Sequence, residues 1–212
     1  MLHRYSFNNG TASDSVGGSA YAGSLIAGAK VTNNQANFTK SGAYVNLPSG
    51  LFGNYTAVSA EAWVTTGVNT GYARIFHFGA SGNSDANSLT VCRNNTPGSS
   101  AYYFSLMWVD ASNGFHTLLT GVSFDFKKNV HVVMTVSGGS YARLYINGVL
   151  QGSSPVVVSP LPPATVFHIG SGLPYNSLVG SVNEFRIWAG VLSAPDIAAR
   201  YSQGPGNDSS SY

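Results

Sequence analysis

The stretch GSVNEFRIWAGVLSAPDIAARY (180–201) changes its pattern half-way along. Its first part, GSVNEFRIW (180–188), mixes β-branched and aromatic residues and predicts a strand. Its second part, SAPDIAARY (193–201), predicts a short helix, because a serine can cap it, Pro-Asp suits its first turn and an arginine its last. No other stretch predicts a helix as clearly, so the sequence favours a β-rich fold with one helix near its C-terminus.

The rest of the chain predicts strands. Runs rich in Val, Ile, Tyr, Phe and Thr alternate with clusters of turn-forming residues, which is typical of an all-β sandwich or barrel. Between two such runs, Asn147-Gly148 predicts a tight hairpin, since both residues tolerate positive φ. Strands are expected at 2–7, 43–47, 59–66, 73–79, 88–94, 102–109, 116–121, 129–137, 141–148, 165–170 and 180–188.

The chain has 212 residues, no internal repeat and no change of composition before Gly204. One domain over residues 1–203 is therefore the simplest account. The tail GPGNDSSSY (204–212) has the composition of a flexible linker. The Pro-rich stretch SPVVVSPLPPA (154–164) is expected at a sheet edge or in a loop, because proline cannot donate to a sheet ladder.

The composition indicates where the protein acts and which classes of partner are not expected. Charged residues make up 8% of the chain, against about 25% in an average protein, and the polarity comes from Asn, Ser, Thr and Gly. This profile suits an extracellular or surface-displayed β-protein. The net charge is +2 without a basic stripe, so nucleic acid is not an expected partner. No apolar run approaches the ~18 residues of a membrane span, so membrane insertion is not expected.

Several stretches together carry a resemblance to a known family. They are LHRYSFNNGTASDSVGG (2–18), SAEAWVTT (59–66), ARLYINGVLQGS (142–153), FHIGSG (167–172) and the opening stretch (180–201). In order and spacing they resemble the LamG-like jelly-roll domain of the concanavalin A-like lectin/glucanase superfamily, over residues 2–203. The resemblance implies an all-β, two-sheet antiparallel jelly-roll sandwich with one short C-terminal helix, in which the first and last strands pair.

Fold alone does not decide function here, because the superfamily holds lectins, adhesion modules and polysaccharide-cleaving enzymes. Retaining glycoside hydrolysis needs two carboxyl groups about 5 Å apart. In related glucanases they stand close together on one strand, but neither Glu61 nor Glu184 has an acidic residue two or four positions further on. The histidines also lack the motif pattern of the related alginate lyases. The sequence thus favours a non-catalytic binding module over a hydrolase or lyase.

The resemblance implies a structural Ca²⁺ at the sandwich edge, where an acidic residue of the first turn approaches the last strand. The matching positions are Asp14, Asn183 and Glu184, and calcium prefers such oxygen ligands. Asn183 stands where the family often has Asp, which lowers the charge of the site. Two other roles stay open: Asp14 as an Asx-turn residue, and Glu184 as a cross-strand partner of Arg186 or Arg4.

A glycan site is expected where aromatic and amide side chains gather in loops, because sugar rings stack on aromatics and their hydroxyls need polar partners. The best region spans SGNSDANS (81–88) and YYFSLMWVDASNGFH (102–116). Core packing is the alternative for the tryptophan at 108. The candidate ligand-binding residues are Tyr72, Asp85, Asn87, Trp108, Asp110, Asn113, His116 and Tyr175.

The expected ligand is accordingly a glycan or a surface glycoprotein. A second hypothesis is a protein-binding adhesion or self-assembly module, which includes a homo-oligomer. Low charge and many small polar residues suit the broad, flat contact surfaces that such a module needs.

Overall fold

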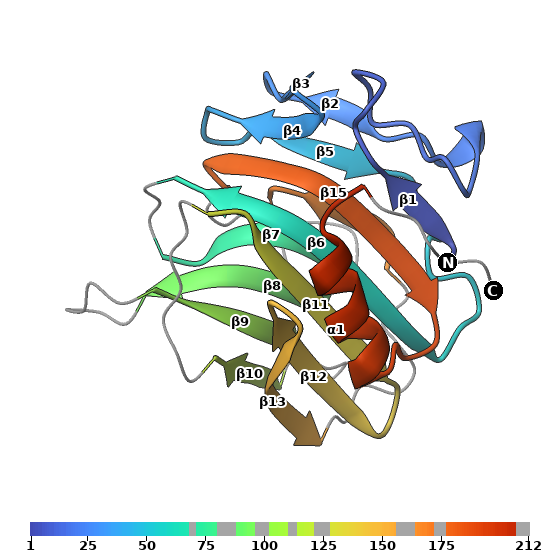
Figure 1. Ribbon diagram of the computed structural model, residues 1–212, viewed down its shortest axis with the longest axis vertical. Coiled ribbons are helices and arrows are strands. Elements are labelled where there is room, and N and C mark those ends of the chain that lie inside the picture. Colours follow the sequence, from blue (N-terminus) through green and yellow to red (C-terminus); the bar gives the residue numbers. More distant parts are fainter. Residues whose placement is uncertain are drawn as a thin grey trace.

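The protein is described from a computed structural model, which covers residues 1–67, 71–79, 88–95, 102–109, 114–120, 128–155, 164–171 and 177–206. Two antiparallel sheets, here called sheet A and sheet B, form a sandwich (Figure 1). The all-β prediction with a short C-terminal helix is therefore confirmed. The tail beyond residue 206 lies outside the described residues, so the division into a domain (1–203) and a linker (204–212) stays a prediction.

Sheet A holds the last strand near its middle. The first strand, β1 (His3–Tyr5), pairs with residues 185–187 of that last strand, as expected. In order, sheet A consists of β13 (Val149–Pro155), β12 (Tyr141–Ile146), β11 (Val130–Ser137), β6 (Ala57–Thr66), β15 (Gly180–Ala189), β4 (Gln35–Phe38) and β3 (Lys30–Thr32).

Sheet B is built mainly from the middle of the chain. A short 3₁₀ turn, η1 (Ser19–Tyr21), precedes β2, one of the two edge strands of this sheet. In order, sheet B consists of β10 (Phe115–Leu119), β9 (Tyr102–Val109), β8 (Ser88–Asn95), β7 (Ala73–Gly79), β14 (Val166–Ile169), β5 (Tyr44–Leu47) and β2 (Ser24–Ile26).

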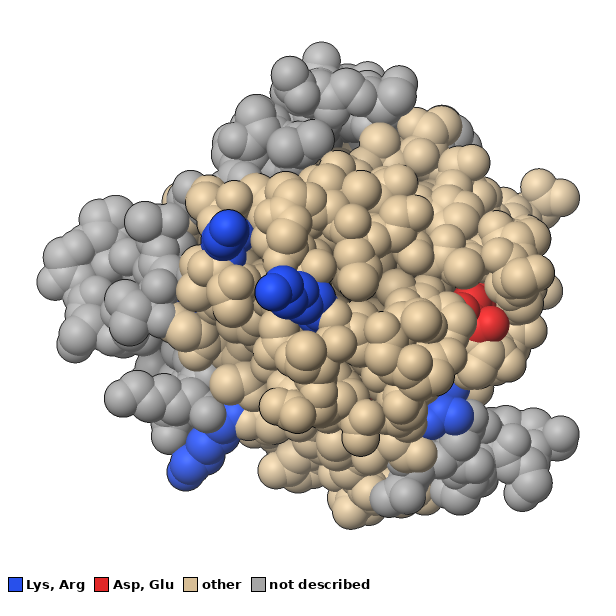
Figure 2. All heavy atoms as spheres, turned by 90° about the horizontal axis from the view of Figure 1, so that it is seen from above, with Lys and Arg blue, Asp and Glu red and all other residues tan. Residues whose placement is uncertain are grey.

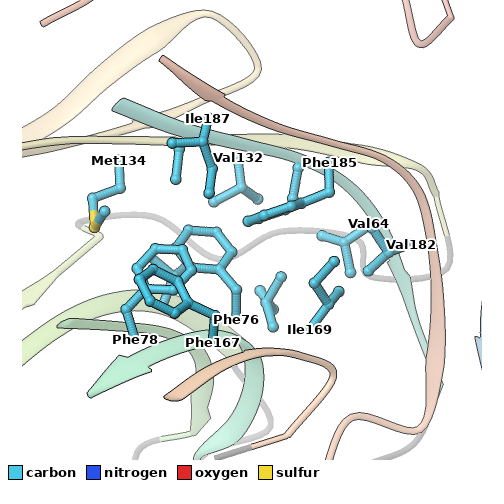
Figure 3. Close-up of a cluster of buried hydrophobic side chains, with 14 of the residues drawn as sticks. Val64, Phe76, Phe78, Val132, Met134, Phe167, Ile169, Val182, Phe185 and Ile187 are labelled. Atoms are coloured by element: carbon cyan, nitrogen blue, oxygen red, sulfur yellow. The ribbon is translucent and has the colours of Figure 1, made fainter. Parts of the chain in front are cut away.

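The core lies between the two sheets. Because successive side chains of a strand point to opposite faces, each strand sends every second residue inward. Figure 3 shows aliphatic and aromatic side chains of sheet A meeting aromatic side chains of sheet B, all of them buried. Each such side chain contributes about 1.5–3 kcal/mol by leaving water. The labelled examples are Val64, Val132, Met134, Val182, Phe185 and Ile187 from sheet A and Phe76, Phe78, Phe167 and Ile169 from sheet B.

The helix α1 (Ala194–Gln203) covers part of the outer face of sheet A (Figure 1). Ser193 caps it by accepting a hydrogen bond from the Asp196 backbone N–H at 3.2 Å. Its buried Ile197 packs on Val133 and Tyr145 of the sheet. No helix in the described part of the chain is long and apolar enough to cross a membrane.

The predicted hairpin at Asn147-Gly148 is confirmed. The two residues have φ values of 50° and 80° and join β12 to β13. The Pro-rich stretch begins at the end of β13, which is an edge strand of sheet A. Pro155 is the last residue of β13. Residues 156–163 lie outside the described residues.

Candidate functional site

The predicted ligand-binding residues fall into two groups. Five of them lie outside the described residues: Asp85, Asn87, Asp110, Asn113 and Tyr175. Of the others, Tyr72 is 48% exposed in the turn before β7. Trp108 belongs to the core cluster and is 2% exposed. His116, opposite it on β10, stacks on the indole at 5.2 Å. The arrangement matches the core-packing alternative for Trp108, and the predicted loop site stays a prediction.

Asp14 is held by N–H donors on both oxygens. Its Oδ1 accepts hydrogen bonds from the backbone N–H groups of Arg4, Val16 and Gly17 at 2.8–3.0 Å. Its Oδ2 lies 2.6 Å from Nδ1 of His3, and Nε2 of the same imidazole lies 3.1 Å from the Leu51 carbonyl oxygen. Burial alone would raise the pKa of the Asp14 carboxyl, but these hydrogen bonds outweigh it and lower the pKa below its ordinary value.

Glu184 takes part in a buried ion-pair network on the outer face of sheet A. Its Oε1 accepts from Nε of Arg4 at 2.7 Å and from Nε of Arg186 at 3.1 Å. Arg186 also reaches Oε1 of Glu61 at 3.3 Å, and the same Glu61 oxygen lies 3.0 Å from Nε2 of His131. The network is buried, apart from a small part of Arg4. Glu184 thus acts as a cross-strand ion-pair partner.

Helix α1 packs against one end of this network. The ring of Tyr201 stacks against Trp63 and His131, each at 5.9 Å, and the Arg200 guanidinium lies 4.4 Å above the Trp188 ring. The helix therefore covers His131, the member of the network that lies next to Glu61.

The predicted calcium ligands do not form an open set of oxygens. Arg4 connects the two carboxylates, because its backbone N–H binds Asp14 and its side chain binds Glu184. Asn183 is half-buried at a β-bulge of β15. Among the described residues there is no group of three or more His, Cys, Asp or Glu side chains suited to a metal. As they lie, these residues fit an ion-pair network better than Ca²⁺, and calcium stays a prediction.

The outer face of sheet B carries a row of polar side chains, which we call the histidine face. Register places His77 opposite both Thr90 and His168, and His168 opposite Asn46, so these side chains share one face. The members of the histidine face are Tyr44, Asn46, Arg74, His77, Thr90 and His168.

Close contacts connect the members of the histidine face. His77 Nδ1 lies 2.7 Å from Thr90 Oγ1. The rings of His168 and Tyr44 lie 4.4 Å apart at 47°. Nδ1 of His168 is buried without a hydrogen-bond partner. Whereas His77 and His168 are buried, Tyr44 is half-buried and Asn46 is exposed, so the face opens to solvent along β5.

Burial keeps both imidazoles of this face neutral. It lowers the pKa of His77 to about 3, helped by the charge of Arg74 and by His168. It lowers the pKa of His168 to about 4. A neutral imidazole can both donate and accept a hydrogen bond, which suits a ligand hydroxyl.

We expect the two histidines to stay neutral from pH 8 to pH 5. Their C2–H proton resonances should not move over that range, whereas an unperturbed histidine titrates near pH 6.5. The two imidazoles take up protons near pH 6.5 in the unfolded chain, but only near pH 3 to 4 in the folded chain. The free energy of unfolding is therefore unaffected by these groups above about pH 6.5 and falls as the pH is lowered from there towards the folded pKa values. An NMR titration checks this expectation, and a midpoint near pH 6.5 for either resonance contradicts it.

Sequence reasoning noted His77 and His168 only in rejecting a lyase motif, and it did not name Tyr44, Asn46 or Thr90. A usable signal was present. In the predicted strands 43–47 and 88–94, alternate residues such as Tyr44 and Asn46 are polar or aromatic, which is the period of one sheet face. The strands that carry His77 and His168 show no such alternation, because a bulge interrupts 73–79 and Val166 and Gly170 stand two positions from His168. What the sequence cannot give is which of these strands are neighbours.

Comparisons with known proteins give one family and many structures. A family model described as the concanavalin A-like lectin/glucanases superfamily matches residues 39–198. A search of curated proteins gives no match. Domain 4 of the arabinanase AbnA from Geobacillus stearothermophilus, solved in complex with arabinotriose, superposes with a TM-score of 0.68 at 19% identity. The match covers 93% of this chain and 96% of that one.

Two further similar structures are longer than this chain. The ligand-binding domain of botulinum neurotoxin serotype D, in complex with N-acetylneuraminic acid, superposes with a TM-score of 0.70 at 16% identity over 95% of this chain and 50% of that one. A sialidase of Trypanosoma rangeli superposes with a TM-score of 0.70 at 19% identity, and the match covers 97% of this chain and 33% of that one. At these identities the likeness shows the fold. The family match over most of the chain and the two-sheet sandwich together show that the chain belongs to the concanavalin A-like lectin/glucanases superfamily.

Proposed function

We propose that the protein is a non-catalytic glycan-binding module and that the open border of the histidine face receives the sugar. The observation that carries the proposal is the pairing of a half-buried Tyr44 ring with His168, whose Nδ1 has no hydrogen-bond partner, beside the exposed Asn46. A sugar ring can stack on Tyr44 while its hydroxyls bind the amide and the neutral imidazole. An extracellular or surface-displayed location is part of this proposal.

The distribution of acidic groups supports a binding role over catalysis. The acidic side chains in the described part of the chain are Asp14, Glu61, Glu184 and Asp196, and none of them belongs to sheet B. Glu61 and Glu184 share the buried guanidinium of Arg186. Carboxylates that are buried and paired in this way offer no group exposed to a glycosidic bond for hydrolysis.

The similar structures support a glycan as the ligand class. The AbnA domain is matched over nearly its whole length and was solved with arabinotriose. The neurotoxin domain was solved with N-acetylneuraminic acid, although this chain spans only half of that structure. The two sugars differ in charge, so a screen should include neutral and acidic glycans.

The test is a glycan-array screen of the purified protein, with calcium and with a chelator. We expect specific binding, reduced about 10-fold in affinity by Asn46→Ala and by Tyr44→Leu, since each removes one hydrogen bond or stacking contact. Asn8→Ala, at another exposed asparagine, is the control and should bind as the wild type does. Binding lost with chelator would support the predicted calcium.

Failure to bind any glycan would contradict the proposal. It would favour the second function, a protein-binding or self-assembly module. The edge strand β10 is the feature that suits this alternative, because Phe115 and Leu119 on it are 57% and 53% exposed.

A further inference from the structure

A hollow of about 470 Å³ lies in sheet A, where β15 begins and β4 and β6 end. Its size falls within the roughly 300–1,000 Å³ of small-molecule sites. The hollow therefore lies in sheet A, whereas the histidine face belongs to sheet B. The lining residues are Asn37, Phe38, Thr39, Thr65, Thr66, Gly67, Val179, Gly180 and Ser181.

A row of hydrogen-bonding side chains crosses this hollow. Register pairs Ser181 with Asn37 on one side and with Thr65 on the other, so the three share one face of three adjacent strands. Ser181 donates to Oε1 of Gln35, which fixes its hydroxyl. The Asn37 side-chain N–H₂ donates to Thr32 and Gln35, so the row presents to a ligand the hydroxyls of Ser181 and Thr65 and the amide oxygen of Asn37.

Glycine keeps the hollow open at its base. Gly180 has a φ of 156°, and a Cβ there would lie 2.9 Å from the Thr66 Cα. β15 therefore approaches β6 closely and has no side chain at this point. The neighbouring Thr66 is 3% exposed, lines the hollow, and has no hydrogen-bond partner for its Oγ1. Because Thr66 alternates with Thr65 along β6, its side chain lies on the core side of the sheet, and the outer-face row of Asn37, Ser181 and Thr65 is the part of the hollow that can contact a ligand.

The lining defines the chemistry of the ligand. It contains hydroxyl, amide and apolar groups and no Asp, Glu, Lys, Arg or His. Figure 2 views the molecule from the side on which β2, β3 and β4 lie in Figure 1, and among the described residues the few charged side chains stand apart between uncharged ones. A charged ligand finds no counter-ion among the lining residues, whereas a neutral polyhydroxylated ligand finds matching partners.

We propose that this hollow is a second sugar subsite, specific for a neutral monosaccharide unit. It rests on the proposed function, because its ligand is again a glycan, but it uses other residues on the other sheet. Two sites on different sheets would let the module bind two chains or two branches of a glycan, which raises avidity without strengthening either site.

The test is an NMR titration of the ¹⁵N-labelled protein with three neutral probes: methyl α-D-mannopyranoside, methyl β-D-galactopyranoside and methyl α-L-arabinofuranoside. For at least one probe we expect saturable shifts of the amides of Asn37, Thr65, Gly67 and Ser181. Thr65→Val keeps the shape but removes a hydroxyl, so it should weaken the affinity about 2- to 10-fold. Thr117→Val, on an exposed position of β10, is the matched control and should leave the affinity unchanged.

The outcomes separate this inference from the proposed function. Saturable shifts at the hollow that weaken in Thr65→Val support the inference. Shifts confined to Tyr44, Asn46 and His168 overturn the second subsite and leave the proposed function standing. No shift with any probe also overturns the subsite, and the glycan array then decides the proposed function independently.

Discussion

Arg186→Met should lower the free energy of unfolding by about 3–5 kcal/mol, because it breaks a buried ion pair by removing one partner. The Arg186 guanidinium binds both Glu61 and Glu184 at 3.1–3.3 Å in a site that is essentially closed to water. Methionine fills similar volume but leaves two carboxylates without that cation. Urea unfolding at pH 7 measures the change.

The matched control is Arg143→Met, on β12 of the same sheet. The Arg143 guanidinium lies 4.1 Å above the Tyr141 ring and is half-buried, so its loss should cost about 1 kcal/mol. A loss for Arg186→Met no larger than for Arg143→Met would mean that the network is not held by this cation.

Gly180→Ala should be the most damaging change of a single methyl group, at roughly 3–5 kcal/mol. The new Cβ would overlap the backbone of Thr65 and Thr66, which belongs to a paired central strand and cannot move aside easily. The φ of 156° adds strain for any residue with a Cβ. Thermal and urea unfolding of the variant measure the loss.

Gly190→Ala separates backbone strain from the steric overlap. Gly190 has a φ of 77°, but a Cβ there would meet nothing within 4 Å. This variant should cost about 1–2 kcal/mol, the strain of a positive φ alone. Equal losses at the two glycines would contradict the close approach of β15 to β6.

The strands with strong alternation and clear flanking turns could be predicted from the sequence. Residues 59–66 and 180–188 were expected as strands and form most of β6 and β15, which are neighbours in sheet A. The helix was predicted from its cap and first turn, and Ser193 does cap it. In each of these elements local chemistry and burial favour the same structure, so a local pattern was sufficient.

The strands that prediction missed are short or irregular. β2, β3 and β4 have three or four residues each and are separated by turns in which Ala27, Asn33 and Asn34 have positive φ. β13 was expected only as the second strand of the Asn147-Gly148 hairpin and without bounds, since it contains Gly152 and ends at Pro155, and both residues disfavour strands. These strands form because a neighbouring strand supplies hydrogen bonds, which a local pattern does not reveal.

The candidate site was predicted less well than the fold, for a physical reason. The sequence named Glu184 as a candidate calcium ligand and left its pairing with Arg186 or Arg4 open as the alternative, and the structure shows both ion pairs. This alternative could be formulated because residues two apart share a face and the first and last strands were expected to pair. The contact between Tyr44 and His168 joins segments more than a hundred residues apart through the β5–β14 pairing. Such a contact depends on the strand order, which local spacing does not contain.

The most direct test of the central claim is a calorimetric titration of the strongest glycan from the array into the wild type and into His168→Phe. The account predicts a saturable heat for the wild type and affinity weakened at least 10-fold in the variant, which keeps the packing on Tyr44 but removes the unpaired Nδ1. Unchanged affinity in a folded His168→Phe variant would contradict binding at the histidine face.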